Sequence, residues 1–329
     1  MLKDEKIKDA LIMLCYVCAL GAFGAFFRWL QMQTARDAET GMMNPSVLNI
    51  LLPLTIIAAA LVLLQRTRKL TANELAFPTG MGEALRGLSI VYIICAWIIA
   101  ALMVIGGVMT IMASTLDSLR SMYLLIAVLA ILSGLSFPLI CSASRSRYSP
   151  SLVSVLMTIP IIMYAIWLVA SYRGSANDPN VWRYAIEVIT ICVVIIALLY
   201  VAGYAFGKPN PKAACYTSLL GAFMCITTLS DSRYMGLELI FLATAGMLLI
   251  YGWLIIKNRC PKSELPAEPD PVVADDEPEA EAEPEEDTVI EPDQDAEPAP
   301  EPTIEAPAKK SKSAQDEELE SIIHDFKAH

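Results

Sequence analysis

Four charged side chains lie in or beside long apolar stretches of the sequence: Arg28, Arg183, Glu187 and Glu238. A charged group costs roughly 2.5 to 3.5 kcal/mol at the centre of a bilayer, so a charge kept within an apolar segment is a candidate for binding or transport. Glu187 follows Arg183 by four residues, which places both on one face of a helix. If their helices are neighbours, the four residues form an outer polar cluster that could line a vestibule or bind a small zwitterion.

The same residues have a structural interpretation. Each lies near the predicted end of an apolar segment, where a long side chain can bury its stem and reach the lipid headgroups. In that case the four charges stabilise helix ends and bind nothing. The sequence leaves both interpretations open.

A second candidate site lies at the C-terminus, where four apolar residues follow a helical period. Ser313 and a run of acidic residues come before them and favour a helix start, so we predict a short amphipathic helix over 314–328. Such a helix is marginal alone, and we expect it to dock on a cytoplasmic protein. The alternative is that it folds back onto the protein's own loops or frays. The docking residues are Leu319, Ile322, Ile323 and Phe326.

Signs of catalysis or metal binding are missing from the sequence. Both histidines follow residue 323, so the apolar part lacks the commonest general base. The sequence contains no Walker A loop, dinucleotide fingerprint, zinc-protease motif or nucleophile elbow. Cys15 and Cys18 form a C-x-x-C without a second ligand pair, and we interpret both as apolar packing residues. We expect no catalytic residue, no metal, no cofactor and no nucleic-acid partner.

The chain joins two parts of unlike composition. Of its 329 residues, 55% are hydrophobic and 18% charged, with a net charge of −11. Residues 263–329 hold 23 acidic and 4 basic side chains, against 12 acidic and 20 basic in residues 1–262, so the net charges are −19 and +8. The first part is too apolar for a soluble domain, and the second is too charged to fold alone. A conventional soluble enzyme is excluded.

The first part has the composition of a membrane domain. A spanning helix needs about 20 mainly apolar residues, because its backbone must be satisfied without water. We therefore predict an all-α polytopic membrane helix bundle with eight transmembrane helices. The seventh span is the least apolar. We interpret the glycines and prolines within the spans as packing features. The spans are 10–30, 46–65, 88–113, 121–141, 151–171, 184–206, 213–230 and 235–256.

The basic residues predict the orientation of the membrane domain (1–262). With the N-terminus inside, the cytoplasmic segments hold 14 Lys and Arg residues and the opposite loops hold six. Short loops rich in these residues stay in the cytoplasm. We therefore expect both termini in the cytoplasm, in a plasma membrane or a bacterial inner membrane.

The segment from 263 to 313 alternates Glu, Pro and Ala. Like charges repel one another and repeated prolines prevent a helix, so we predict a disordered acidic linker that ends in the short amphipathic helix.

These features predict an integral membrane protein, with the lipid bilayer as its first partner, that anchors or scaffolds a cytoplasmic protein through its tail. A small-solute transporter or channel subunit is the alternative, and an intramembrane enzyme is a third class that ranks last. A polar cavity near mid-depth with an inward Glu187 would favour transport. A solid interior with Glu187 at the rim would favour the anchor.

Overall fold

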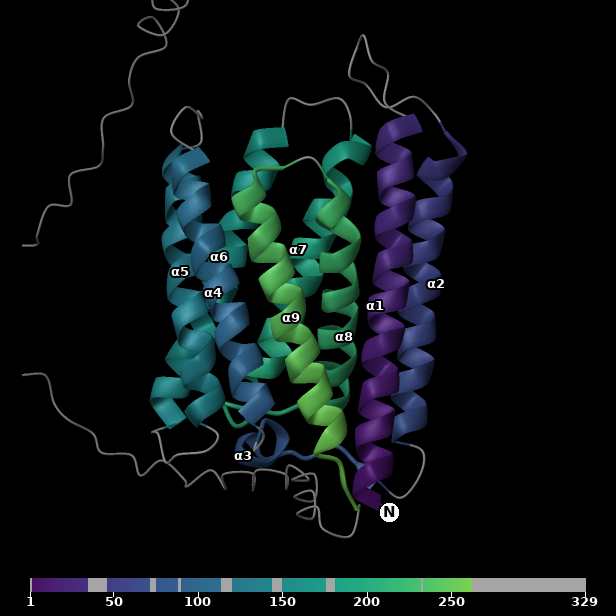
Figure 1. Ribbon diagram of the computed structural model, residues 1–329, viewed down its shortest axis with the longest axis vertical. Helices are drawn as coiled ribbons and strands as arrows, with labels where there is room; N and C mark the ends of the chain where they lie inside the picture. Colours follow the sequence, from purple (N-terminus) through teal and green to yellow (C-terminus); the bar gives the residue numbers. More distant parts are fainter. Residues whose placement is uncertain are drawn as a thin grey trace, which may run out of the picture. The chain divides into compact units, whose positions relative to one another are not determined.

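Eight long helices make up most of the described part of the computed structural model (Figure 1). The structure describes residues 2–34, 46–71, 75–87, 90–113, 120–143, 150–175, 181–231 and 233–261. All eight helices are long and apolar enough to span a membrane, which confirms the predicted all-α, multi-pass fold. They are α1 (Leu2–Thr34), α2 (Val47–Leu70), α4 (Ile90–Ala113), α5 (Arg120–Ala143), α6 (Pro150–Ser175), α7 (Val181–Ala202), α8 (Pro211–Thr227) and α9 (Met235–Lys257).

Short elements connect the long helices, and the sequence did not predict them. A single turn, α3 (Met81–Ala84), lies between α2 and α4, and a 3-10 turn, η2 (Thr228–Ser230), extends α8. Strand β1 (Leu75–Ala76) pairs antiparallel with β2 (Cys260–Pro261), so the chain beyond α9 returns to the segment that follows α2.

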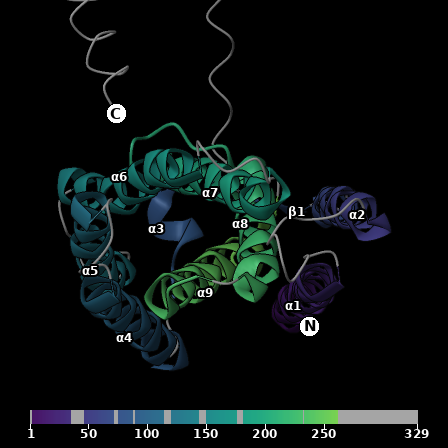
Figure 2. The same cartoon turned by 90° about the horizontal axis from the view of Figure 1, so that it is seen from above.

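Helices α4 to α9 form a closed ring. Each packs against the next in the chain, and α9 closes the ring by packing against α4, as the view from above shows (Figure 2). Aromatic residues from three sides meet inside the ring, because Phe137 on α5 contacts Tyr251 on α9, and Trp167 on α6 contacts Phe241 on α9.

Helices α1 and α2 lie outside the ring. Helix α1 packs against α8 and α9, and α2 packs against α1 and α8 (Figure 2). Two glycines allow the close approach of α1 to α8, since a Cβ on Gly21 would meet Ile226 at 2.9 Å and one on Gly24 would meet the side chain of Thr227. Close approach through small residues is typical of membrane helices.

The least apolar span, α8, lies among four other helices. Helices α1, α2, α7 and α9 all pack against it, and 67% of its most apolar stretch is buried, against 22% in α2. Two of its threonine hydroxyls bond within the helix, as Thr217 donates to the carbonyl of Ala213 at 2.7 Å and Thr227 to that of Phe223 at 2.9 Å. Because α8 faces protein rather than lipid, it tolerates polar residues that a peripheral span could not.

The prolines and glycines within the spans leave the helices continuous. Pro53, Pro138 and Pro160 lie inside α2, α5 and α6. Helices α4 and α9 cross where two glycines meet, because a Cβ on Gly236 would lie 2.6 Å from the carbonyl oxygen of Gly106. These residues serve packing, and none of them ends a helix in mid-span.

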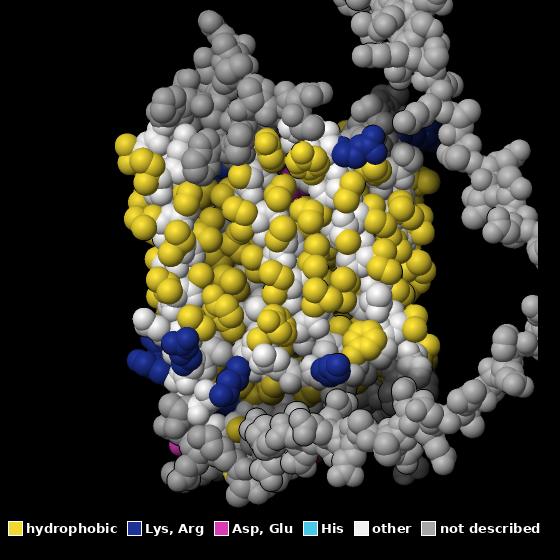
Figure 3. All heavy atoms as spheres, turned by 180° about the vertical axis from the view of Figure 1, so that it is seen from behind, with side chains coloured by type: hydrophobic (Ala, Val, Ile, Leu, Met, Phe, Trp, Pro, Cys, Tyr) yellow, Lys and Arg dark blue, Asp and Glu magenta, His cyan; other side chains and the backbone are white. Residues whose placement is uncertain are grey.

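Most helix residues that face outward are apolar. In Figure 3 hydrophobic side chains form a band across the helices, and most of the visible Lys and Arg side chains lie below it. Below the band is the end of the bundle where α1 begins and α9 ends, which we call the terminal end (Figure 1). The loop between α8 and α9 lies at the opposite end.

Candidate functional site

A buried chain of polar side chains is centred on the loop between α8 and α9. Asp231, the first residue after η2, uses both of its carboxylate oxygens. Its Oδ1 accepts a hydrogen bond from Arg28 Nε at 2.5 Å, and its Oδ2 accepts one from Arg233 Nη2 at 2.5 Å. One carboxylate therefore bridges two guanidinium groups, one from α1 and one from its own loop.

From Arg28 the series of hydrogen bonds continues to α2. Arg28 Nη1 donates to Gln31 Oε1 at 2.8 Å, and Gln31 Nε2 donates to Asn49 Oδ1 at 2.8 Å. Arg28 and Gln31 are three residues apart, which places them on the same face of α1. Both side chains are fully buried, so these hydrogen bonds join α1 to α2 out of contact with lipid and water.

From Arg233 the series of hydrogen bonds continues into the ring. Arg233 Nε donates to Glu187 Oε2 on α7 at 3.0 Å, and Trp167 Nε1 on α6 donates to Glu187 Oε1 at 3.1 Å. The Arg233 guanidinium carbon lies 4.7 Å from the centre of the Phe241 ring on α9, within the range of a cation–π contact.

A stack of side chains lies next to these residues inside the ring. The rings of Tyr164 and Trp167 lie parallel, with centroids 5.5 Å apart, and Tyr164 shares a hydrogen bond of 2.6 Å with Thr244. Both rings are buried, and they fill the interior beside Glu187.

We call this set the rim network, and its members are Asn49, Gln31, Arg28, Asp231, Arg233, Glu187 and Trp167. It holds two positive and two negative groups, so it is neutral overall, as a buried cluster of charges must nearly be. It links the ring helices α6 and α7 and the loop before α9 to the two helices outside the ring.

Arg233 stays protonated at any ordinary pH. Burial lowers the pKa of its guanidinium, but the carboxylates of Asp231 and Glu187 raise it by more, so the pKa lies above its usual value. Its Nη1 group is buried and has no hydrogen-bond partner among the described residues.

The structure brings together two of the four predicted cluster residues. Arg28 and Glu187 join through Asp231 and Arg233, and Arg28 is fully buried, so it does not extend to the lipid headgroups. The side chain of Glu238 is half-buried, and within the described part of the chain it makes no hydrogen bond or ion pair. The side chain of Arg183 lies outside the described residues.

The central residues of the network were not among the sequence candidates. Asp231 and Arg233 lie two apart in a connection of four residues between two apolar spans, and that shortness is a signal that both must lie at the rim. Gln31 and Asn49 carry no comparable signal, because a single amide near a span end is common.

The arrangement favours holding helices over chemistry. Both carboxylates accept hydrogen bonds from Arg or Trp, so neither is set up as a general base. The most exposed of the network's charged groups is Glu187, at 17%, and it lies at the rim of the ring.

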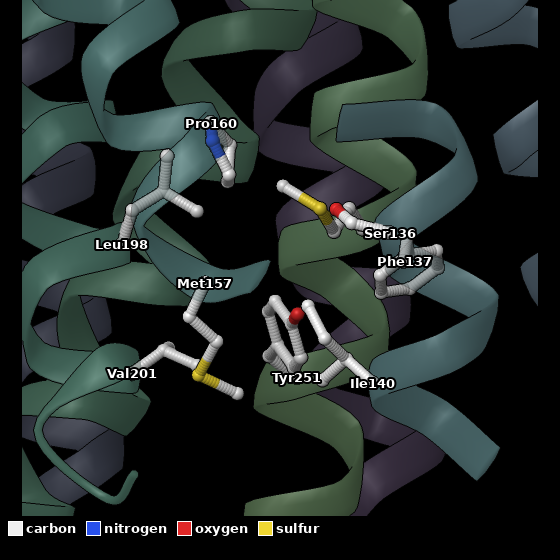
Figure 4. Close-up of a pocket in the computed structure, with 9 residues that line it drawn as sticks. Ser136, Phe137, Ile140, Met157, Pro160, Leu198, Val201 and Tyr251 are labelled. Atoms are coloured by element: carbon white, nitrogen blue, oxygen red, sulfur yellow. The ribbon is translucent and has the colours of Figure 1, made fainter. Parts of the chain in front are cut away.

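A small apolar cavity lies inside the ring (Figure 4). Side chains of α5, α6, α7 and α9 surround it, among them Phe137, Met157 and Leu198, with Ser136 and Tyr251 as its polar members. Its volume is about 10 Å³. That is room for about one water molecule, so the cavity does not resemble a solute-binding site.

A second polar cluster lies at the terminal end, around Arg259. This side chain is 3% exposed and caps two helices, because Nε donates to the carbonyl of Ile256 and Nη1 to that of Leu70, both at 2.9 Å. Its Nη2 donates to Asp9 Oδ2 on α1 at 2.6 Å, and Lys6 Nζ donates to the backbone carbonyl of Arg259 at 2.5 Å.

The neighbours of Arg259 complete what we call the exit clasp, defined as Arg259, Asn258, Asp9, Lys6 and the β1–β2 pair. The side-chain amide of Asn258 donates to the carbonyls of Ala84 at 2.9 Å and Arg86 at 3.1 Å. The exit clasp fixes the chain on the bundle up to Pro261, just before the acidic segment begins. The linker and the predicted docking residues Leu319, Ile322, Ile323 and Phe326 lie outside the described residues.

The cysteines divide by position. Cys141, Cys215 and Cys225 are buried in the bundle, whereas Cys15 and Cys18 are exposed on the outer side of α1. The pair in the C-x-x-C was predicted to consist of packing residues, but both side chains are exposed rather than packed inside the bundle.

Comparison of the chain with protein-family models, curated proteins and solved structures finds no match.

Proposed function

We propose that this protein is a multi-pass membrane anchor that presents its acidic C-terminal segment to a cytoplasmic protein at the membrane surface. The observation that carries the proposal is the exit clasp. A buried arginine with three acceptors and a strand pair hold the residues just before that segment, up to Pro261, against α1, α2 and the 75–86 connection.

The packing of the ring favours an anchor over a transporter. Trp167, Tyr164 and Phe241 are at most 1% exposed and fill the ring interior beside the rim network. The cavity deeper in the ring has room for about one water molecule. A solute pathway would need polar groups that converge on a larger space near mid-depth.

The composition of the tail supports the second half of the proposal. About 50 residues of flexible chain have an end-to-end distance of roughly 35 to 42 Å, and like charges extend it further. The apolar stripe near residue 323 is therefore within reach of proteins beyond the headgroups. The excess of basic residues at the terminal end supports a cytoplasmic location for this end.

Crosslinking of the full-length protein in its native membrane tests the proposal. Ile323→Asp with Phe326→Asp places two charges on the apolar stripe, whereas the control, Ser321→Asp with Ala328→Asp, places them on the opposite face of the same predicted helix. We expect mass spectrometry to find a cytoplasmic protein with the wild type and the control that is lost with the stripe variant. Equal recovery with both variants would reject the docking role.

Protease treatment tests the orientation separately. The acidic segment should be protected in intact cells and cleaved in inside-out vesicles, as read by an antibody to a C-terminal tag. Cleavage from outside intact cells would overturn the cytoplasmic placement and leave the packing of the bundle unaffected.

A further inference from the structure

We propose that Arg66 and Tyr16 form a binding site for the phosphate of an anionic phospholipid in the leaflet at the terminal end. Arg66 Nη2 on α2 donates to the hydroxyl of Tyr16 on α1 at 2.8 Å. The guanidinium carbon also lies 4.6 Å from the centre of the Tyr16 ring. These two contacts hold the cation in one place between α1 and α2.

The guanidinium retains donors for a ligand. An arginine has five N–H donors, and within the described part of the chain Arg66 uses one of them, on Tyr16. The side chain is exposed on the outside of the bundle. A planar fork of free N–H groups matches two oxygens of a phosphate, which is the geometry that arginine binds best.

The position of Arg66 along α2 suits a headgroup. The helix ends at Leu70, four residues or about 6 Å beyond Arg66, so the guanidinium lies close to the membrane surface. Lys69 is three residues further on, is exposed, and shares this face of α2. Two cations on one face attract an anionic lipid more strongly than a zwitterionic one, whose ammonium group they repel.

Apolar side chains continue from the phosphate site towards the middle of the bilayer. On α1, Leu20 and Phe23 follow Tyr16 by four and seven residues on the same face, and Phe23 is 54% exposed. On α2, Val62 precedes Arg66 by four residues and is 38% exposed. An acyl chain can lie along this surface, which distinguishes a lipid from a soluble phosphate as the ligand.

The matched control is Arg68→Gln. Arg68 is exposed near the end of the same helix and carries the same charge, but it lies two residues from Arg66 and therefore on another face. The test variant is Arg66→Gln. A second variant, Tyr16→Phe, keeps the ring and removes only the hydroxyl that orients the guanidinium.

Native mass spectrometry of the purified full-length protein measures the binding of phosphatidylglycerol and, for comparison, phosphatidylcholine. We expect the wild type and Arg68→Gln to retain phosphatidylglycerol in preference to phosphatidylcholine. Arg66→Gln should bind phosphatidylglycerol roughly tenfold more weakly and Tyr16→Phe roughly threefold more weakly, all four proteins having the same melting temperature.

Three outcomes would overturn the proposal. The first is equal retention of the two lipids by the wild type, and the second is an equal effect of Arg66→Gln and Arg68→Gln. The third is displacement of the bound lipid by millimolar glycerol 3-phosphate, which would indicate a site for soluble phosphate esters without a role for the acyl chain.

Discussion

Arg28 and Asp231 are 203 residues apart in the chain, and their side chains meet at 2.5 Å with exposures of 0% and 7%. The pair joins α1, which lies outside the ring, to the loop between α8 and α9. Near this point α1 approaches α8 through Gly21 and Gly24, which permit close contact with Ile226 and Thr227 but specify position weakly. We infer that the ion pair fixes the depth and rotation of α1 on the ring.

Replacement of Arg28 by methionine should destabilise the protein strongly. Asp231 would keep Arg233 but lose its second partner, and Gln31 would lose its donor. Removal of one partner from a buried ion pair costs about 3 to 5 kcal/mol. Unfolding in mixed micelles should show this loss, while the control Arg68→Met, at an exposed site, should leave the stability close to that of the wild type. If Arg28→Met unfolds like its control, the pair does not hold α1.

The sequence predicted the eight helices because length and apolarity alone decide whether a segment can span a bilayer. Even α8 was found, although its polar residues made it the weakest span, and the structure shows that it faces other helices. Arg28 and Glu187 stood out because charges near apolar segments are rare. Their connection could not be predicted, since it depends on Asp231 and Arg233, whose place beside them follows from closure of the ring.

The exit clasp also could not be predicted from the sequence, because it joins residues that are far apart in the chain. Ala76 and Cys260 pair across 184 positions in strands of two residues each, too short to leave a periodic pattern in the sequence. Arg259 is one of several basic residues after the last span, and composition assigns all of them to the membrane surface. Only the tertiary arrangement shows that Arg259 is buried whereas Lys257 is only half-buried.

Both carboxylate oxygens of Glu187 should contribute to the stability of the folded protein. Glu187→Leu removes the acceptors of Arg233 Nε and Trp167 Nε1, so a buried cation and a buried indole lose partners, at a cost of about 2 to 4 kcal/mol. Glu187→Gln keeps one oxygen for Trp167 and should cost less. With ¹⁵N-labelled tryptophan, the indole N–H signal of Trp167 should shift strongly in the leucine variant and slightly in the glutamine variant. Equal shifts would show that the indole does not bond to this side chain.

Gly236 should not tolerate even one added methyl group. A Cβ at this position would lie 2.6 Å from the Gly106 carbonyl oxygen and 2.5 Å from the Thr110 backbone nitrogen, and backbone atoms cannot turn aside. Gly236→Ala should push α9 from α4 and cost about 1 to 3 kcal/mol, measured as a lower melting temperature. The control is Gly82→Ala in α3, where a Cβ meets nothing within 4 Å. If both variants melt like the wild type, the two helices do not cross this closely.

Arg259 should control how firmly the acidic segment is attached to the bundle. Arg259→Met frees the carbonyls of Leu70 and Ile256 and leaves Asp9 without its cation, so the β1–β2 pair loses its support. Hydrogen exchange at the amides of Leu75, Ala76 and Cys260 should become faster, while exchange in the α4–α9 crossing stays unchanged. Asp9→Asn should have a small effect, because Asp9 is 44% exposed and such ion pairs contribute at most about 1 kcal/mol. Lys257→Met is the control, since Lys257 lies over the Trp253 ring and outside the clasp. Unchanged exchange at the Cys260 amide in Arg259→Met would mean that the strands hold this part of the chain without the arginine.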